Sequence, residues 1–341
     1  MLLHNKKFYH IITSLGIGGA QKTLRCFIKS SENRYENTVI SFKDECGELN
    51  LLNCLKLIFS IHNSSNTIVC CWMYHSIFAG LLLKLFKRKI TVILMIRNGL
   101  DSLQSLKLST LIIIWLSAKF SFLANKSIYC SCSSMNAHLA FGFAKNNAIF
   151  VYNGIKLPDG FEKFIYKKSP YVFSTVARYE PQKGYKILLD ALSLLDCMII
   201  NVRIKYIIYG ENTSKLFIPK FSKIDVEIYD PVVSSISAST ILDISSYHVL
   251  PSLSEGFANI NLEALSRSNF IICSETGDSH VFPKDICHTF PVSDFRLLAK
   301  ILFIIVNSPP RNLNLPLVAD LLKTRFPESN FDNLVHQSLN A

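Results

Sequence analysis

One stretch of the chain decides the fold, and it reads Ser254-Glu255-Gly256-Phe257-Ala258-Asn259-Ile260-Asn261-Leu262-Glu263-Ala264. Two carboxylates stand eight residues apart in it. Glu255 lies in the expected loop after a short β-rich run, and Glu263 lies in the helix that follows. This order of strand, polar loop and helix is typical of an α/β unit whose ligand lies beyond the carboxyl end of the strand.

The spacing of the two carboxylates suits a ligand with two groups of hydroxyls. Eight helical residues rise about 12 Å, a length comparable to the reach from the sugar ring to the ribose of a nucleotide sugar. We expect Glu255 to accept hydrogen bonds from sugar hydroxyls and Glu263 from ribose hydroxyls. The helix N-terminus between them offers N–H groups and a positive dipole potential. A glutamate that caps the helix start would explain Glu255 but not Glu263.

Short β-rich runs alternate with helical runs on both sides of this stretch, which favours parallel α/β units. The predicted strands are 8–14, 38–42, 67–72, 91–96, 127–132, 148–152, 171–176, 203–209, 226–229, 248–251 and 270–273. The predicted helices are 20–30, 75–86, 134–141, 186–195, 259–268, 295–305, 315–322 and 331–339, with a helical turn over 239–244. Residues 156–169 mix Pro, Gly, Lys and Asp and are the expected linker. The sequence therefore predicts two Rossmann-like domains.

Length and composition agree with two packed domains. The chain has 341 residues, of which 49% are hydrophobic and 18% are charged, so it can bury two cores and is not disordered. Its formal net charge of +11 suggests an anionic partner. The basic residues look scattered, apart from small groups at 84–89 and 163–168, and no nucleic-acid-binding motif is present. We therefore expect phosphate-bearing ligands and an anionic membrane surface, and no nucleic acid.

An apolar segment over 108–118, extended by 120–124, raises the question of a membrane span. Lys107 and Lys119 bracket only eleven residues of it, whereas a span needs about twenty. We expect a buried or membrane-touching helix there. Residues 1–12 show no secretory signal, and the ten cysteines are interpreted as reduced thiols.

A glycine-rich turn follows the first predicted strand. Gly16-Ile17-Gly18-Gly19 would let backbone N–H groups approach an anion at a helix N-terminus. A simple turn between strand and helix is the other interpretation. The dinucleotide-binding spacing fails, because Gln21 stands where a third glycine is needed.

Two cations follow the first strand of the second half. Arg178 presents a planar fork of donors, and Lys183, before Gly184, adds a mobile point charge. Two cations in one loop suit a diphosphate, although a solvated loop would also place them there.

Together these segments resemble the family-4 retaining glycosyltransferases, whose E-x7-E motif matches Glu255 to Glu263. The other similar segments are Val176-Ala177-Arg178, Lys183-Gly184, Gly16 to Gln21, Trp72-Met73-Tyr74-His75, Ile96-Arg97-Asn98, Val151-Tyr152-Asn153-Gly154-Ile155 and Gly277-Asp278. They run in the family's order between about residues 8 and 285. The chain has no Asp-x-Asp, the motif with which other glycosyltransferases hold a metal.

The resemblance implies a GT-B fold, with two Rossmann-like domains facing each other across a cleft. Residues 1–160 would bind the acceptor and 161–320 the nucleotide sugar, and a C-terminal helix over 321–341 could cross back to the first domain. The implied catalytic residues are Glu255, Arg178, Lys183 and His75. The implied donor-binding residues are Gly18, Gly19, Gly256, Phe257, Ala258, Asn259, Glu263 and Arg97. No metal or cofactor is implied.

The implied activity is transfer of a hexose or N-acetylhexosamine from a UDP- or GDP-sugar to a glycan, with retention of configuration. We expect the acceptor to be a lipid-linked O-antigen or capsule intermediate. The enzyme would be cytoplasmic and peripheral on the inner face of a bacterial inner membrane. Two alternatives remain: another GT-B enzyme, such as a nucleotide-sugar epimerase or a phosphorylase, and a non-catalytic scaffold that binds nucleotide sugars.

Overall fold

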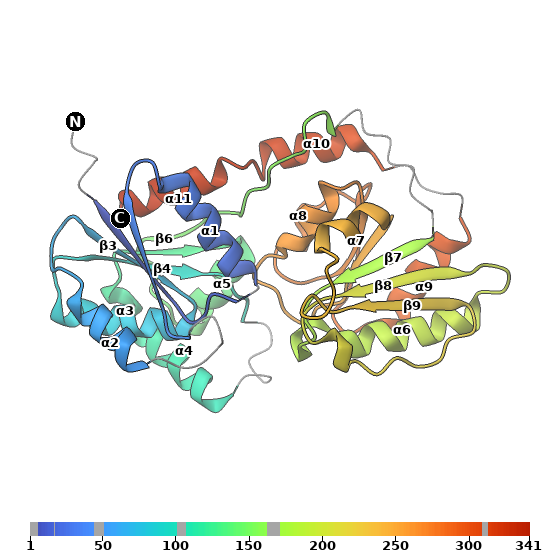
Figure 1. Cartoon of the computed structure of the whole chain (residues 1–341), viewed down its shortest axis with the longest axis horizontal. Helices are drawn as coiled ribbons and strands as arrows, with labels where there is room; N and C mark the ends of the chain where they lie inside the picture. Colours follow the sequence, from blue (N-terminus) through green and yellow to red (C-terminus); the bar gives the residue numbers. More distant parts are fainter. Residues whose placement is uncertain (1–5, 17, 44–50, 101–106, 162–170, 309–312) are drawn as a thin grey trace. The chain divides into compact units, whose positions relative to one another are not determined.

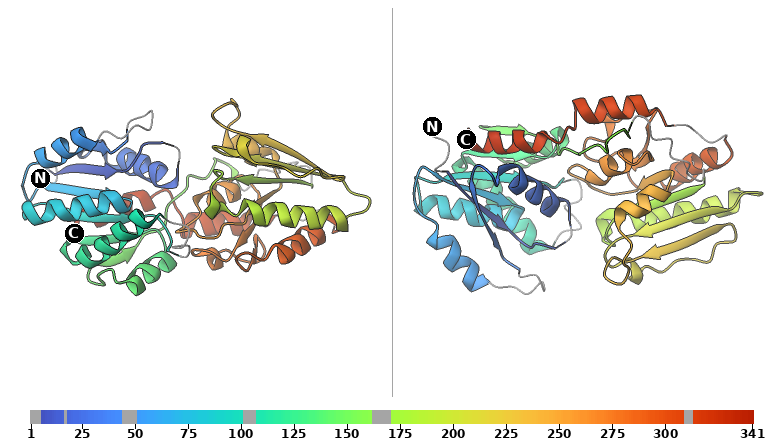
Figure 2. Two further views of the ribbon diagram at one scale, coloured as in Figure 1. Left: turned by 90° about the horizontal axis from the view of Figure 1, so that it is seen from below. Right: turned by 45° about the horizontal axis from the view of Figure 1, so that its top comes forward.

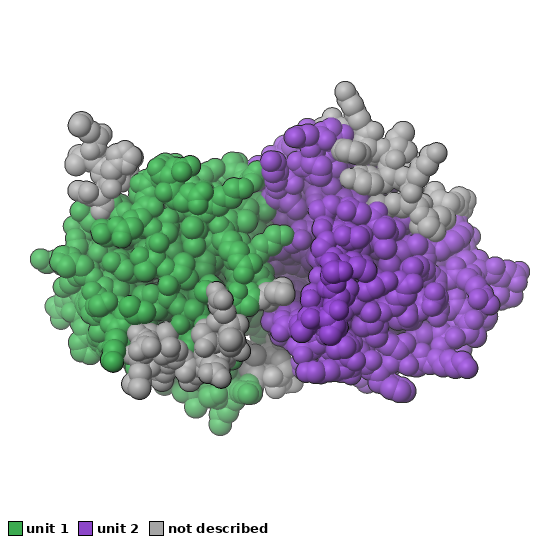
Figure 3. Space-filling model, viewed as in Figure 1, with its two compact units in different colours: residues 1–154, 328–341 green, residues 155–327 purple. Residues whose placement is uncertain are grey.

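The computed structural model describes residues 6–16, 18–43, 51–100, 107–161, 171–308 and 313–341, without the side chains of 51–54. The chain forms two compact units (Figures 1 and 3). Unit 1 comprises residues 1–154 and 328–341, and unit 2 comprises residues 155–327. The chain therefore passes from one unit to the other twice.

Unit 1 is built on a six-stranded parallel sheet in the order β2-β1-β3-β4-β5-β6. Its strands are β1 (Lys7–Ile12), β2 (Glu36–Ser41), β3 (Thr67–Trp72), β4 (Thr91–Ile96), β5 (Lys126–Tyr129) and β6 (Ala148–Phe150). β3 is buried along its whole length and reads Thr-Ile-Val-Cys-Cys-Trp. Such unbroken apolar runs are typical of central parallel strands, because helices cover both of their faces.

Helices cover both faces of this sheet (Figure 1). They are α1 (Gly19–Ser31), α2 (Leu51–Ser60), α3 (Tyr74–Phe86), α4 (Leu108–Phe120), α5 (Cys132–Phe141) and α11 (Asn330–Leu339). On one face, Leu24 and Phe27 of α1 share a core with Leu334 and Val335 of α11. On the other face, α2, α3 and α4 pack against the sheet in a separate core. The chain's last helix is therefore part of unit 1.

Unit 2 holds a second parallel sheet in the order β12-β11-β10-β7-β8-β9. Its strands are β7 (Val172–Val176), β8 (Ile204–Tyr209), β9 (Ile224–Tyr229), β10 (Tyr247–Leu250), β11 (Phe270–Ser274) and β12 (Cys287–Phe290). The strand order reverses between β7 and β10, because the chain first builds outward through β8 and β9 and then returns to the other side of β7. Ligands of open α/β sheets bind at such switch points.

The helices of unit 2 also form two layers (Figures 1 and 2). They are α6 (Tyr185–Met198), α7 (Ala238–Ile244), α8 (Asn259–Leu265), α9 (Phe295–Val306) and α10 (Leu315–Thr324). α6 and α9 share a core on one face of the sheet, and α7 and α8 pack on the other. None of the described helices of the chain combines the length and apolar character that a bilayer crossing requires.

The predicted α/β class with two Rossmann-like sheets is confirmed, with local differences. α2 and β12 were not predicted. The predicted helix 259–268 ends at Leu265, since Ser268 has a φ of 60°. The side-chain amide of Asn269 donates to the carbonyls of Ala264 (3.1 Å) and Leu242 (2.9 Å) at that helix end. Most of the expected linker, residues 162–169, lies outside the described residues.

Candidate active site

Arg178 and Glu255, two of the predicted catalytic residues, lie near the switch point of the unit 2 sheet. Arg178 comes two residues after β7, and Glu255 comes five residues after β10. β7 and β10 are hydrogen-bonded neighbours, with Tyr247 opposite Phe173. The carboxyl ends of the two strands therefore open on the same edge of the sheet, where the loops that carry Arg178 and Glu255 begin.

Lys183 and Glu255 form an ion pair at this edge. The Nζ of Lys183 lies 2.6 Å from Oε1 of Glu255, and the two side chains are only 16% and 12% exposed. The hydroxyl of Ser252 donates to the same carboxylate oxygen at 2.7 Å. The backbone N–H of Leu253 donates to the carbonyl of Gln182 at 2.8 Å, which joins the two loops directly. Contacts from both loops thus hold the pair in place. The ammonium of Lys183 has three N–H donors, so it can contact an anion as well as Glu255.

Gly184 is the residue that lets these two loops meet. It adopts a φ of 66°, a left-handed conformation that favours glycine. A Cβ added there would lie 1.9 Å from the carbonyl oxygen of Pro251. Any larger residue would therefore push the Lys183 loop away from the segment that carries Glu255.

Arg178 contacts a second acid in its own loop. Its Nη1 lies 3.0 Å from Oε1 of Glu180, and both side chains are partly exposed. The N–H of Tyr179 donates to the carbonyl of Glu211 at 2.8 Å, which ties this loop to the one that follows β8. A guanidinium carries five N–H donors, so a single carboxylate contact is compatible with binding a phosphate.

Glu263 lies in the second turn of α8 and is half-buried. The helix begins only at Asn259, so Glu255 lies outside it. The expected separation of eight helical residues is therefore wrong, and the loop sets the distance between the two carboxylates. The 277 turn packs against this loop: a Cβ on Gly277, whose φ is 55°, would lie 2.9 Å from the carbonyl oxygen of Gly256.

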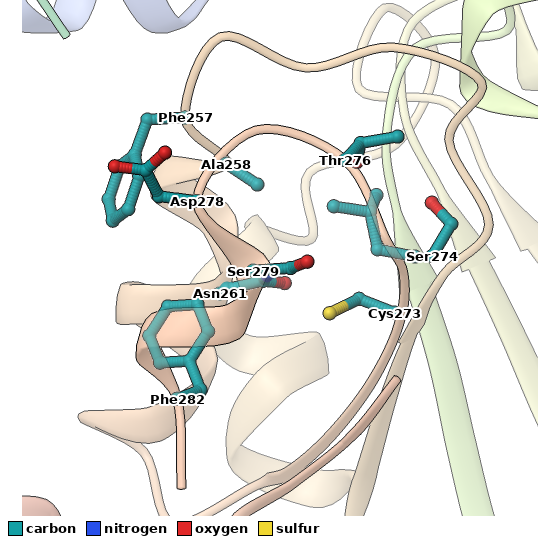
Figure 4. Close-up of a pocket in the computed structure, with 10 residues that line it drawn as sticks. Phe257, Ala258, Asn261, Cys273, Ser274, Thr276, Asp278, Ser279 and Phe282 are labelled. Atoms are coloured by element: carbon teal, nitrogen blue, oxygen red, sulfur yellow. The ribbon is translucent and has the colours of Figure 1, made fainter. Parts of the chain in front are cut away.

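A pocket adjoins this loop (Figure 4). Its lining residues come from the loop, from α8 and from the segment after β11, and they are Leu250, Phe257, Ala258, Asn261, Cys273, Ser274, Thr276, Asp278, Ser279 and Phe282. Oδ1 of Asn261 is buried there without a hydrogen-bond partner. The ring of Phe257 packs against those of Phe282 and Phe326, with centroids 6.3 and 5.4 Å apart. The side chain of Phe257 therefore anchors the loop, and Phe257 and Ala258 both line the pocket.

Several residues of this site were not predicted. Glu180 stands two residues from Arg178, and Ser252 stands three before Glu255, so local spacing could have identified both. Phe282 and Phe326 are distant in sequence from Phe257, and no local pattern indicated their contact. The predicted Gly256 and Asn259 lie in the same segment as Glu255.

The remaining predicted site residues lie in unit 1, around the switch point between β1 and β3. Gly18 and Gly19 stand at the N-terminus of α1, which has no side-chain cap, and Ile17 lies outside the described residues. His75 is exposed in the first turn of α3, and partial burial lowers the pKa of its imidazole. Met73 immediately before α3 has a φ of 73°, which is strained for a side-chain-bearing residue. Backbone strain of this kind clusters at functional sites.

Arg97 follows β4 and is buried. Burial lowers the pKa of its guanidinium to about 10. Its Nη1 donates to Oδ1 of Asn153 at 3.3 Å, and its Cζ lies 5.7 Å from the ring centre of Trp72. The hydroxyl of Thr23 in α1 donates to the same Asn153 oxygen at 3.3 Å. Arg97 is thereby linked to the first turns of α1.

The described residues include no group of three or more His, Cys, Asp or Glu side chains arranged to hold a metal ion. The charged groups at the switch point of unit 2 are the pairs Lys183–Glu255 and Arg178–Glu180. This arrangement can place cations against a phosphate and carboxylates against hydroxyls.

Comparison with known proteins agrees with this arrangement. Residues 159–282 match the model of the family described as glycosyl transferases group 1. An uncharacterized glycosyltransferase of Methanocaldococcus jannaschii is 30% identical over 141 residues, which are 39% of this chain and 36% of that relative. The match therefore spans about a third of the relative's length.

Solved structures resemble the whole chain. HepE of Anabaena in complex with UDP-glucose has a TM-score of 0.73 at 14% identity, covering 98% of this chain and 99% of that one. Sucrose-phosphate synthase of Thermosynechococcus elongatus has a TM-score of 0.74 at 11% identity, covering 97% and 98%. The lipopolysaccharide outer core galactosyltransferase WaaB has a TM-score of 0.66 at 16% identity, covering 98% and 99%. The chain therefore has the GT-B fold, and the family match over 159–282 supports a glycosyltransferase.

Proposed function

We propose that this protein transfers a hexose or N-acetylhexosamine from a UDP- or GDP-sugar to a glycan acceptor, with retention of anomeric configuration. The observation that carries the proposal is the pairing of Lys183 with Glu255 beside Arg178 at the switch point of a sheet that matches the glycosyl transferases group 1 model. Cations and a carboxylate at that position suit a diphosphate joined to a sugar.

In the proposed step the bond between the anomeric carbon and the diphosphate oxygen breaks, the bonding electrons leave with the diphosphate, and the acceptor hydroxyl bonds to the anomeric carbon and gives its proton to the leaving phosphate. Negative charge then develops on the leaving phosphate, and Arg178 and Lys183 would stabilise it. Removal of one such preorganised donor costs about 3 kcal/mol in the transition state, which is a hundredfold or more in rate. Glu255 would orient the donor sugar and Glu263 would hold the ribose, and we assign no protein nucleophile. The proposed step uses no metal, and Arg178 and Lys183 would supply the positive charge that contacts the diphosphate.

In unit 1 we propose that His75 contacts the donor sugar or an acceptor hydroxyl. Gly18, Gly19 and Arg97 would contribute to donor binding from the same unit. The strained turn at Met73 supports a role for His75, because that turn sets where α3 begins.

The acceptor we propose is a lipid-linked O-antigen or capsule intermediate, used at the inner face of a bacterial inner membrane. The structural similarity to WaaB, a lipopolysaccharide outer core galactosyltransferase, supports an acceptor of this class. The structure of HepE with UDP-glucose likewise supports a UDP-sugar as the first donor to test.

The test begins with UDP-, GDP- and ADP-sugars against the purified protein, scored by thermal shift and then by nucleotide release with lipid-linked acceptors. We expect one donor to raise the melting temperature, and Glu263→Ala to abolish that shift. The anomeric configuration of the product, determined by NMR, tests retention.

Variants separate catalysis from general surface charge. Arg178→Ala and Glu255→Ala should each lower kcat by on the order of a hundredfold. Lys186→Ala is the matched control, since Lys186 lies in α6 and its side chain is 88% exposed. Transfer by both site variants at the wild-type rate would refute the proposal. A thermal shift without turnover would indicate a scaffold, and release of an epimerised or phosphorylated sugar would indicate another GT-B enzyme.

A further inference from the structure

α4 of unit 1 carries apolar side chains on the face that points to solvent. Leu108, Ile112 and Trp115 are exposed and follow each other at the spacing of one helix face, and the exposed Lys119 continues the stripe. The opposite face buries Ile114 against the sheet. A surface helix normally has a polar outer face. The outer face of α4 is instead apolar, and no described residue of unit 1 covers it.

α3 repeats this pattern beside α4. Leu82, Leu85 and Phe86 are exposed, Phe86 by 72%, and Lys89 follows at the same spacing after the helix ends. α3 and α4 are in contact with each other. The two exposed stripes therefore belong to neighbouring helices on the same face of the sheet (Figure 1).

α2 extends the surface. Leu57 and Phe59 are exposed at its end, next to the exposed Lys56. The ammonium of Lys87, just after α3, donates to the carbonyls of Phe59 and Ile61 and so ties the ends of the two helices together. We call the exposed outer side of α2, α3 and α4 the apolar–basic face.

The segment that contains the apolar–basic face has a large positive net charge. Residues 51–154 contain ten Lys and Arg and a single acid, Asp101, which lies outside the described residues. This segment therefore carries +9 of the chain's net charge of +11. Lys and Arg are no denser in this segment than in the rest of the chain, so its positive charge results from its lack of acids.

We propose that the apolar–basic face docks onto an anionic lipid bilayer, with its apolar side chains in the headgroup region and its Lys and Arg against lipid phosphates. Interfacial helices combine these two features, and basic residues near an anionic surface each add about 1 kcal/mol. A second copy of the chain is a poorer occupant, since it would oppose like charges. The inference rests on the proposed function, because docking onto a bilayer would give the enzyme access to a lipid-linked acceptor.

The experiment measures binding of the full chain to vesicles of phosphatidylcholine, with and without phosphatidylglycerol, at low and high salt. We expect co-flotation with the phosphatidylglycerol vesicles at low salt, weakened by high salt because exposed charges are screened. No binding to anionic vesicles at low salt would overturn the inference.

Substitutions test which face binds. Trp115→Glu and Phe86→Glu should each lower the vesicle partition coefficient at least tenfold. Phe217→Glu is the control, because Phe217 is 84% exposed in unit 2. The double variant Arg88→Gln/Lys89→Gln should lower partitioning about fivefold per charge removed, and Lys220→Gln should leave it unchanged. Equal losses in the control variants would overturn the assignment to this face.

Two further measurements complete the test. Light scattering of the wild type and Trp115→Glu gives the oligomeric state, and a dimer abolished by Trp115→Glu would assign the face to a second copy and overturn the inference. The donor thermal shift should be the same in all these variants. Donor binding without vesicle binding would refute only the inference, and vesicle binding without donor binding would refute only the proposed function.

Discussion

At the residue scale, the candidate site depends on a few side chains that face the edge of a sheet. The pair of Lys183 and Glu255 is largely removed from water. Removing one partner of such a pair leaves a charge without its counterion, which is costly. The two loops therefore have to keep their mutual position for the site to exist, and Gly184 sets that position.

We predict that Gly184→Ala destabilises unit 2 by about 2–5 kcal/mol. The left-handed conformation costs a non-glycine residue about 1–2 kcal/mol, and forcing a Cβ against a packed backbone adds about 1–3 kcal/mol. Urea unfolding measures the change in the free energy of unfolding. Gly160→Ala is the control: its φ is 73°, but a Cβ there meets no atom within 4 Å. Equal losses in the two variants would show that the contact with Pro251 does not matter.

At the element scale, α11 completes the core of unit 1 although it ends the chain. Leu334 and Val335 pack with the buried side chains of α1 and the sheet. Lys126 at the start of β5 donates to the carbonyls of Gln337 (3.0 Å) and Asn340 (3.1 Å), near the C-terminal end of α11. A cation at that position also complements the helix dipole.

We predict that Leu334→Ala lowers the free energy of unfolding of unit 1 by about 2–5 kcal/mol, because it opens a cavity in a packed core. Asn333→Ala, one residue earlier on the exposed side of α11, should change it by less than about 0.5 kcal/mol. Differential scanning calorimetry checks both values. If Leu334→Ala were as mild as the control, α11 would not be part of the unit 1 core.

At the scale of the whole molecule, both units follow the same plan of a parallel sheet with helices on each face. In each unit the predicted site residues follow strands at or beside the switch point. Each unit also contains buried histidines. Burial lowers the pKa of His10 to about 4, of His138 to about 4 and of His248 to about 3.

We predict that the protein loses stability as the pH falls from about 6.5 to about 4. Unfolded histidines have a pKa near 6.5, so in this window the unfolded state binds more protons than the folded state. The free energy of unfolding then falls by up to about 1.4 kcal/mol per pH unit for each buried histidine, and the loss ends below the folded pKa values. Melting temperatures measured across this range test the trend.

His248→Leu supplies the internal check on this pH dependence. His248 belongs to unit 2, whereas His10 and His138 belong to unit 1. The substitution should flatten the acid dependence of the unit 2 transition and leave that of unit 1 unchanged. An unchanged slope in unit 2 would assign its acid sensitivity to other groups.

The sequence by itself determined most of the strands and helices, and it identified the segments that carry Arg178, Lys183, Glu255 and Glu263. It could do so because side-chain periodicity and turn residues act over a few neighbouring positions. Only the tertiary structure decided that Lys183 meets Glu255, 72 residues away, and that α2, α3 and α4 leave a shared apolar–basic face exposed. Those outcomes depend on strand order and on which helix covers which side of a sheet. Contacts between distant segments set both, and no local pattern encodes them.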